Sequence, residues 1–440
     1  MDMILYPHQK DALNQTKDLN RVAYYHDMGL GKTFTGAEKM VRLGARTNLL
    51  ICQKSKIQDW INHFFTYYKE DLLIFDLTNQ TDLKMFLNDE SSSPFERIGV
   101  INYELAWRRK ELLQLHDFTL MLDESSLIQN RKAKQTKFIL KLQPSNVILL
   151  SGTPTAGKYE NLWTQAHLLG WNISESLYNK QYINWKLLTV PGGMKVKVVD
   201  KTEPYKNIDR LKEKFHEHGA RFLKTEECFD LPERTFVDVK VRAPKEYQEF
   251  MRDGYTVLNG EEIIGDTSLT KRLRARQLCG EHAQNKLNAF RDLILSTNDR
   301  LIVFYNFNEE LAVLIHICEE ARRPVSIING QIKDCENYEC CSNSVTLVQY
   351  QAGAMGLNLQ KANKIVYFTP PERCELWMQS QKRIHRIGQT RPCFYYKLIC
   401  EKSIEENIYE ALERGTDYTD ELFRKDFKNE FSLQSANRTN

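Results

Sequence analysis

Short apolar runs alternate with amphipathic segments along the first part of the chain. The apolar runs predict strands, and the segments between them, whose apolar residues recur with helical period, predict helices over 34–43, 56–68 and 104–115. The predicted strands span 22–25, 48–52, 72–77, 97–102, 119–122 and 146–150. Strand–helix alternation at this spacing is typical of βαβ units, so we expect a parallel sheet.

The pattern changes over 159–231, where helical segments dominate and Pro191, Gly192 and Gly193 indicate a turn between two short strands. Alternation then resumes and predicts a second α/β domain. Its strands are expected at 235–241, 301–305, 325–328, 346–350, 364–368 and 393–398, and its helices at 309–321, 376–386 and 403–413. We therefore expect an N-terminal lobe at 1–170, a helical insertion or connector at 171–232, a C-terminal lobe at 233–415 and a polar tail at 416–440.

Composition narrows the class of protein. The 440 residues are 42% apolar and 27% charged, as in ordinary soluble domains. The formal net charge is only +3, so a nucleic-acid surface must be a local patch. No apolar run approaches the roughly 18 residues of a membrane span, and we find no secretion signal. We expect a protein that makes no membrane contact and is not secreted, either cytoplasmic in a bacterial or phage-infected cell or otherwise intracellular.

The ten cysteines are expected to be free thiols in such a protein. Cys335, Cys340 and Cys341 cluster, but this spacing lacks a second Cys pair or a nearby His pair. A reduced loop is favoured there over a zinc site.

A glycine-bearing turn follows the first predicted strand and leads into a helix. Gly29 and Gly31 allow the backbone to take positive φ and to approach a ligand closely. Free N–H groups at the helix start favour an anion, as in triphosphate-binding loops. Lys32 would contact the β- and γ-phosphates and Thr33 would bind Mg²⁺. In the strict pattern G-x-x-x-x-G-K-[ST], His26 stands where the first Gly is expected. The alternative to a phosphate-binding loop is therefore a turn that holds no phosphate.

Two acidic residues, Asp123 and Glu124, follow another predicted strand. A carboxylate at a strand end beside a phosphate loop can hold Mg²⁺, and a second one can orient and deprotonate a water molecule. A solvated acidic turn is the structural alternative.

Gln379, Arg383 and Arg386 have the spacing i, i+4, i+7, which places them on one face of the helix predicted at 376–386. Guanidinium groups can neutralise the charge that develops on a transferring phosphate. The alternative is a basic surface helix that contacts a phosphate backbone or nothing.

Basic residues with neighbouring aromatic residues recur elsewhere and would suit phosphate-backbone contacts collectively, although each run alone suits a solvated surface. They are Lys54, Lys56, Tyr103, Arg108, Arg109, Arg221, Lys224, Lys271, Arg272, Arg274 and Arg276.

Taken together and in order, these stretches resemble the Swi/Snf-type DNA translocases of helicase superfamily two, over about residues 4–412. The resemblance is carried by Leu5–Gln9, Asp27–Thr33, Cys52–Trp60, Asn102–Glu104, Asp123–Glu124, Ser151–Pro154, Arg221–Pro232, Gln351–Leu359 and Gln379–Gln389. It implies two tandem RecA-like parallel-sheet lobes with a helical insertion between them, and an ATPase activated by double-stranded or branched DNA.

The resemblance also implies a role for each matching residue. Gln9 would recognise adenine; Thr33 and Asp123 would hold the metal, and Glu124 would activate water. The nucleotide would further contact Met28, Gly29, Leu30, Gly31, Lys32, Thr33, Gly356 and Asn358, with Arg383 and Arg386 completing the site from the second lobe. Coupling would involve Ser151, Thr153 and Gln379, and DNA contacts Lys54, Ser55, Tyr103, Arg221 and Lys224. ATP and Mg²⁺ are the expected cofactors, and DNA is the expected partner, with replication, recombination or repair proteins as further candidates.

Two features depart from the family pattern. Ser126 stands where the family has a His that links the ATP site to the third motif, and the region between Gly330 and Thr346 is short. The chain would consist of the ATPase core without added modules, like the compact members of the family found in phages. A strand-separating helicase acting on DNA or RNA, and a non-catalytic nucleic-acid binder with a decayed ATP site, remain the alternatives.

Overall fold

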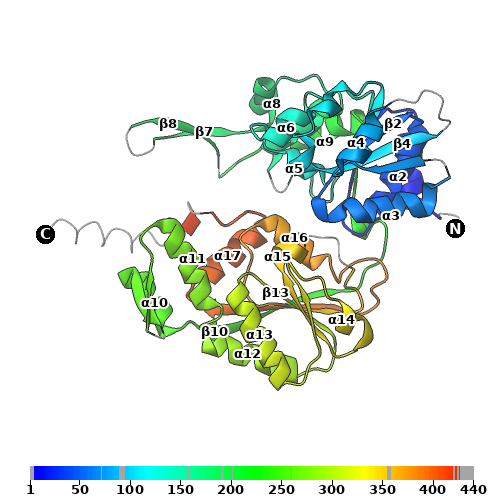
Figure 1. Cartoon of the computed structure of the whole chain (residues 1–440). Coiled ribbons are helices and arrows are strands. Elements are labelled where there is room, and N and C mark those ends of the chain that lie inside the picture. The colour runs from blue at the N-terminus through cyan, green and yellow to red at the C-terminus, as the bar shows by residue number, and fades with distance from the viewer. Residues whose placement is uncertain are drawn as a thin grey trace. The chain divides into compact units, whose positions relative to one another are not determined.

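The computed structural model describes residues 4–70, 72–88, 95–155, 158–189, 193–200, 202–258, 260–353, 358–419, 422–423 and 426. They belong to two compact units, unit 1 (Met1–Phe229) and unit 2 (Asp230–Asn440). Each unit is built on its own sheet (Figure 1). We describe the two units separately.

Unit 1 contains a seven-stranded sheet in which every neighbouring pair is parallel, as the alternating pattern predicts. The strands, in spatial order, are β3 (Leu72–Asp76), β4 (Glu96–Asn102), β2 (Thr47–Cys52), β5 (Phe118–Asp123), β6 (Asn146–Leu150), β1 (Arg21–His26) and β9 (Ala220–Leu223). Successive side chains of a strand enter opposite core clusters: Val22 and Tyr24 of β1 enter one, and Ala23 and Tyr25 enter the other. The sheet is therefore covered on both faces.

The helices of unit 1 lie between these strands in the sequence. They are α1 (Pro7–Gln15), α2 (Lys32–Leu43), α3 (Ile57–Tyr68), α4 (Gln80–Leu87), α5 (Tyr103–Ala106), α6 (Lys134–Ile139), α7 (Trp163–Leu168), α8 (Glu175–Tyr182) and α9 (Ile208–Glu217), with short 3₁₀ turns η1 (Lys54–Lys56), η2 (Lys110–Gln114), η3 (Ser125–Ile128), η4 (Tyr159–Leu162) and η5 (Thr225–Glu227). The helix expected over 104–115 is interrupted: α5 ends at Ala106, and η2 begins at Lys110.

Residues 171–232, expected as a separate connector, belong to unit 1 as far as Phe229. Two helices and an antiparallel hairpin, β7 (Trp185–Thr189) and β8 (Lys195–Val199), occupy most of this segment. The hairpin confirms the two short predicted strands, although Pro191 and Gly192 of the turn lie outside the described residues. β9, which was not predicted, adds to the sheet beside β1.

Unit 2 contains a six-stranded sheet whose neighbouring strands are again all parallel. Their spatial order is β10 (Arg234–Arg242), β17 (Cys393–Glu401), β16 (Lys364–Tyr367), β13 (Leu301–Tyr305), β15 (Val345–Gln349) and β14 (Val325–Ile328). The other elements are α10 (Lys245–Asp253), a hairpin of β11 (Tyr255–Leu258) and β12 (Glu261–Ile264), α11 (Ser268–Cys279), α12 (Gln284–Leu295), α13 (Asn308–Glu320), α14 (Glu336–Cys340), α15 (Tyr350–Gly353), α16 (Cys374–Gln381) and α17 (Ile404–Glu413).

The helix predicted at 376–386 is wrong in its C-terminal half, because α16 ends at Gln381. The residues that follow form turns, and a carbonyl and an imidazole among them bond to other parts of unit 2. The N–H of Leu359 donates to the carbonyl of Arg383 (3.2 Å), and His385 Nε2 bonds the carbonyl of Pro232 (2.9 Å). Arg383 and Arg386 therefore do not share a helix face with Gln379.

No helix among the described residues is long and apolar enough to cross a membrane. All ten cysteines are free, with Cys340 exposed and Cys335 and Cys341 half-buried.

Candidate functional site

The glycine-bearing turn joins β1 to α2 with two residues in the left-handed region. Gly29 has φ +93°, and Gly31, the N-cap of α2, has φ +71°. A Cβ on Gly31 would lie 2.3 Å from Nε2 of Gln9, so a larger residue is excluded by contact as well as by φ. The turn thus brings backbone N–H groups to the start of a helix of twelve residues, which is the arrangement that binds phosphate.

Gln9 lies against this turn and is buried. Its Nε2 donates to the carbonyls of Gly31 (3.0 Å) and Leu30 (3.3 Å), while its Oε1 accepts from the N–H of Tyr6 (2.8 Å). The residue predicted to recognise adenine is therefore fixed directly on the glycine-bearing turn.

Lys32, in the first turn of α2, folds back over the loop. Its Nζ donates to the carbonyls of His26 (2.8 Å) and Asp27 (3.2 Å). A Cβ on Gly152 would approach Nζ to 3.3 Å, so the loop after β6 passes close to this ammonium. Thr33 follows at the second helical position and is half-buried.

His26 occupies the position where the strict motif has glycine. Its ring is fully buried, and neither ring nitrogen has a hydrogen-bond partner among the described residues. Burial, with the nearby charges of Lys32 and His8, lowers the pKa of His26 to about 3. The imidazole is therefore neutral at physiological pH.

Asp123 ends β5, the strand next to β6 in the sheet. Trp60 of α3 donates its indole N–H to Oδ2 (2.8 Å), and the hydroxyl of Tyr103 donates to the backbone carbonyl (2.9 Å). Burial raises the pKa of Asp123, while the indole hydrogen bond and the Lys32 ammonium act in the opposite direction. A carboxylate fixed in this way at a strand end suits the oxygen-ligand preference of Mg²⁺.

Glu124 has a left-handed backbone conformation, with φ +56°. Such a conformation is uncommon for a residue with a side chain and is found at functional sites. Oε1 of Glu124 accepts hydrogen bonds from the hydroxyls of Ser126 (3.1 Å) and Ser151 (2.9 Å). The Ser151 bond joins Glu124 to the loop after β6, and the Ser126 bond holds the same oxygen from η3.

The loop Ser151–Pro154 is held by glutamines of neighbouring elements. Gln165 of α7 donates from Nε2 to the carbonyl of Pro154 (3.0 Å), and its Oε1 accepts from Ser125 (2.9 Å). The hydroxyl of Ser151 also accepts the N–H of Thr153 (3.1 Å). Oγ1 of Thr153 is buried without a partner among the described residues.

The predicted site residues of unit 2 differ in burial. Gln379 is buried, and its Nε2 donates to Glu375 (3.2 Å). Arg383 is buried, and burial lowers the pKa of the half-buried Arg386. Asn358 is exposed, and Gly356 lies outside the described residues.

Gln389 shapes the segment that carries the two arginines. Its Nε2 donates to the carbonyls of Ala362 (2.8 Å), Gln360 (3.1 Å) and Ile384 (3.3 Å). One buried amide therefore closes the turn that follows α16.

The predicted DNA contacts fall into two groups. Lys54, Ser55 and Lys224 are exposed. Tyr103 is buried, and Arg221 donates to the carbonyls of Ala220 (2.9 Å), His216 (3.0 Å) and Gln15 (3.2 Å). In this structure Tyr103 supports Asp123 and Arg221 supports β9, so neither presents a free polar group to a DNA surface.

Three supporting residues were not predicted. Trp60 and Gln165 act through contacts between segments distant in sequence, for which a single sequence gives no periodic signal. Thr225, after β9, donates its N–H and its hydroxyl to Oδ2 of Asp27, both at 3.2 Å. Because β9 was missed, its connection to the phosphate loop was missed with it.

Unit 1 thus gathers a lysine, two carboxylates and a helix start at the carboxyl edge of one parallel sheet, the edge where α/β proteins bind ligands. The lysine and the helix start can hold a polyphosphate. Asp123 is placed to hold a metal ion, and Glu124 can then direct a water molecule onto the polyphosphate.

Two family models match the chain. The SNF2-related domain matches residues 15–276, and the helicase conserved C-terminal domain matches residues 285–388. The first match alone covers more than half of the 440 residues.

Curated relatives have low sequence identity to this chain but align over most of its length. A mouse SWI/SNF-related matrix-associated actin-dependent regulator of chromatin, subfamily A member 1, is 22% identical over 88% of this chain and 40% of its own length. An ATP-dependent DNA helicase of Arabidopsis thaliana is 23% identical over 87% of this chain and 56% of its own length. The chain therefore spans about half the length of such relatives.

A relative of matching size is named "Probable global transactivator" in Orgyia pseudotsugata multicapsid polyhedrosis virus, and is 22% identical over 98% of this chain and 94% of its own length. Among solved structures, the Sulfolobus solfataricus SWI2/SNF2 ATPase core in complex with dsDNA aligns over 96% of this chain and 92% of its own, with 19% identity and a TM-score of 0.46. The phage origin expected from the sequence finds no support among these matches.

Proposed function

Because the chain belongs to the SNF2-related family, we propose that it is an ATP-dependent DNA translocase. The observation that carries this proposal is the pair of hydroxyls on Glu124, donated by Ser126 and Ser151. A carboxylate held in this way next to Asp123 is prepared to orient a water molecule, so the departure at Ser126 does not argue for a decayed site.

We propose that unit 1 binds ATP through Gln9 and the phosphate loop, with Met28, Gly29, Leu30, Gly31 and Lys32 around the base and phosphates. Thr33 and Asp123 would hold Mg²⁺, which neutralises charge on the phosphate oxygens. Their fit is supported by Lys32, which lies close to the loop after β6 and near enough to Asp123 to act on its charge. Lys32 must leave the carbonyls that it bonds in this structure to reach a phosphate.

We propose that Arg383 and Arg386 of unit 2 stabilise the charge that develops on the transferred phosphate. The proposal is supported by their place in the chain, since both guanidinium groups lie in the short segment that follows α16, where Arg383 is buried and Arg386 is half-buried. Arg386→Ala is expected to leave ATP affinity nearly unchanged and to lower turnover by about 10³-fold, which steady-state hydrolysis and nucleotide titration measure separately. Normal turnover would exclude this role.

DNA would be bound through its phosphates, at Lys54, Ser55 and Lys224 among other groups. Contacts to phosphates carry little sequence information, which suits a motor that moves along DNA. Partners among replication, recombination or repair proteins, and action inside the cell, are part of the same proposal.

The proposal is tested by the ATP hydrolysis rate with single-stranded DNA, duplex DNA, forked DNA and RNA. Strongest stimulation by duplex or forked DNA is expected. Displacement of a triplex-forming strand without separation of the duplex would identify translocation, whereas duplex separation would identify a strand-separating helicase. Hydrolysis that responds to none of the four nucleic acids would contradict the proposal.

A further inference from the structure

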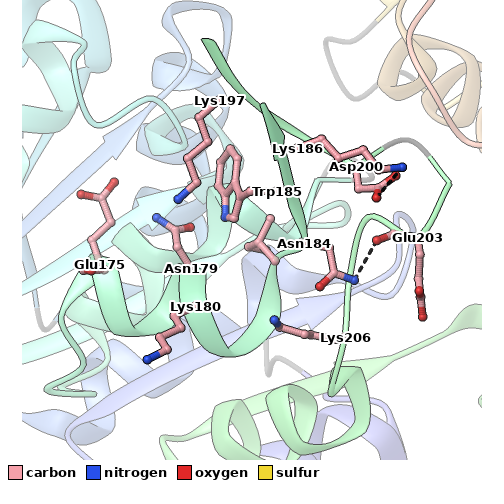
Figure 2. Close-up of a pocket in the computed structure, with 12 residues that line it drawn as sticks. Glu175, Asn179, Lys180, Asn184, Trp185, Lys186, Lys197, Asp200, Glu203 and Lys206 are labelled. Carbon is pink, nitrogen blue, oxygen red and sulfur yellow. Dashed lines mark hydrogen bonds and ion pairs between the residues drawn. The ribbon is translucent and has the colours of Figure 1, made fainter. Parts of the chain in front are cut away.

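The hairpin β7–β8 lies beside a wide polar depression that the ATP site does not use. The depression has a volume of about 940 Å³ and is lined by α8, the hairpin and the segment before α9 (Figure 2). Figure 1 shows the hairpin extending away from the sheet of unit 1. The proposed ATP site gives these residues no role.

Backbone hydrogen bonds hold the rim of this depression in place. Asn184 donates its N–H to the carbonyl of Pro204 (2.9 Å) and accepts at its own carbonyl from the N–H of Asp200 (2.8 Å). Its side-chain Nδ2 donates to the carbonyl of Glu203 (2.8 Å), as Figure 2 shows. Because the rim is fixed before any ligand arrives, little backbone ordering is required on binding.

Four lysines, from α8, both strands of the hairpin and the segment before α9, line the depression. They are Lys180 of α8, Lys186 of β7, Lys197 of β8 and Lys206, which precedes α9. Lysines that only keep a hairpin soluble would not need to line one depression, because any exposed position serves that purpose.

Part of the local negative charge is already neutralised. Asp200 accepts from Lys186 at 2.8 Å, and Glu175 pairs with Arg131. Lys180, Lys197 and Lys206 are exposed and have no carboxylate partner among the described residues. Glu203 is exposed at the edge and is the one lining carboxylate for which the described part of the chain offers no cation.

An aromatic ring fixes the direction of one of these lysines. Nζ of Lys197 lies 5.0 Å from the ring centre of Trp185. In the ladder, Trp185 pairs with Val199 and Leu187 pairs with Lys197, so these side chains share one face of the hairpin. Because the cation–π contact already restricts the side chain of Lys197, less rotamer entropy is lost when Lys197 binds an anion.

The net positive charge of the chain is accounted for by residues 171–219, which include the hairpin. Residues 171–219 contain nine Lys and Arg residues against six Asp and Glu residues, and this excess of three equals the net charge of +3 for all 440 residues. The remainder of the chain is formally neutral. A nucleic-acid-binding protein with so small a net charge needs a local basic patch, and residues 171–219 supply one.

We propose that Lys180, Lys197 and Lys206 bind the phosphodiester backbone of DNA, as a contact additional to those of the helicase motifs. The choice of DNA over another polyanion rests on the proposed function. Phosphates spaced along a strand match ammonium groups spaced around an open depression, and such contacts need no base recognition.

The test measures DNA affinity of the full chain, without ATP, between about 50 and 200 mM salt. For Lys180→Ala/Lys197→Ala/Lys206→Ala, the slope of log affinity against log salt should become shallower by about 2 to 3, because each lost phosphate contact removes about 0.9. A matched variant, Lys69→Ala/Lys84→Ala/Lys141→Ala, removes three exposed lysines of unit 1 and should keep the wild-type slope.

Replacing the same three lysines of the depression by arginine should retain the slope, which separates charge from folding. An unchanged slope in the alanine variant would overturn the proposal, as would a loss of binding to polyglutamate without loss of binding to DNA. If the slope changes as expected but wild-type ATP hydrolysis ignores DNA, the proposed function fails and this contact stands.

Discussion

The carboxyl edges of the two parallel sheets carry polar side chains in both units, and the two sets of side chains are bonded differently. In unit 2, Asn306 follows β13 and donates from Nδ2 to Oγ1 of Thr369 (2.9 Å) and to the carbonyl of Pro370 (3.0 Å). Oε2 of Glu310 accepts from the backbone N–H of Asn306 (2.9 Å) and from Oγ1 of Thr369 (3.1 Å). These bonds tie the polar groups of this edge to one another through Oε2 of Glu310, while Oε1 is buried without a partner among the described residues.

In unit 1 the corresponding edge is open around a glycine turn. Nζ of Lys32 donates to the carbonyls of His26 and Asp27 in its own loop, and Oε1 of Glu124 accepts from the hydroxyls of Ser126 and Ser151. Polar residues directly after a strand therefore occur in both units and do not by themselves identify a ligand site. What distinguishes a candidate ligand site is a backbone, like that at Gly29 and Gly31, that takes positive φ and leads directly into the start of a helix.

The largest effect is expected at the open edge. Lys32→Ala should lower DNA-stimulated ATP hydrolysis by at least about 10²- to 10³-fold, because the ammonium that would contact the phosphates is removed. The thermal midpoint should change less than the hydrolysis rate, since the side chain of Lys32 is half-buried and lies outside the hydrophobic core. Phosphate release and thermal melting measure the two, with Lys141→Ala as the surface control. Full activity in Lys32→Ala would remove the open edge from the ATP reaction.

The edge of unit 2 should respond in the opposite way. Glu310→Ala is expected to lower the free energy of unfolding by about 3 kcal/mol, because it leaves buried donors at Asn306, Phe307 and Thr369 unsatisfied. ATP affinity should be unchanged. Urea unfolding gives the first quantity and nucleotide titration the second. Glu309→Ala, one residue away on the exposed side of α13, should have a small effect on both.

The two edges should also differ in the sign of their pH dependence. Because the pKa of His26 is lowered to about 3, folding is opposed by protonation, and unit 1 should lose about 2 kcal/mol as the pH falls from 7 to 5. Because burial raises the pKa of Glu310 to about 7, unit 2 should instead lose stability as the pH rises from 4.5 toward 7.

Amide exchange of β1 and β13 at several pH values separates the two slopes. His26→Phe should reduce the loss of protection of β1 at pH 5, although buried His63, whose pKa is lowered to about 4, contributes in the same direction. His116→Phe, at an exposed position, should leave both slopes as they are. Parallel slopes in the two strands would contradict the comparison.

The smallest effect is expected where unit 1 resembles unit 2, at the serine hydroxyls on Glu124. Ser126→Ala/Ser151→Ala should lower kcat by about tenfold, equivalent to about 1.4 kcal/mol, with little change in KM for ATP. The carboxylate stays in place but loses its orientation. Each single variant should have an intermediate effect, and Ser145→Ala is the control. A double variant with wild-type kcat would assign orientation to another group.

Most strands, and the candidate site of unit 1, could be predicted from the sequence. The apolar runs at 48–52, 146–150 and 301–305 match strands closely because buried parallel strands are continuously apolar. The glycine turn and Asp123–Glu124 were found because their chemistry is local: φ-permissive glycines, a helix start and carboxylates directly after a strand.

The sequence alone determined that two parallel sheets form and that a phosphate-binding turn opens α2. The tertiary structure decided which side chains serve the site. It turned Tyr103 and Arg221 inward, ended α16 before Arg383, and brought Trp60, Gln165 and Ser151 to their partners. These outcomes depend on hydrogen bonds between segments that only folding makes neighbours, whereas periodicity and turn chemistry act over a few residues along the chain.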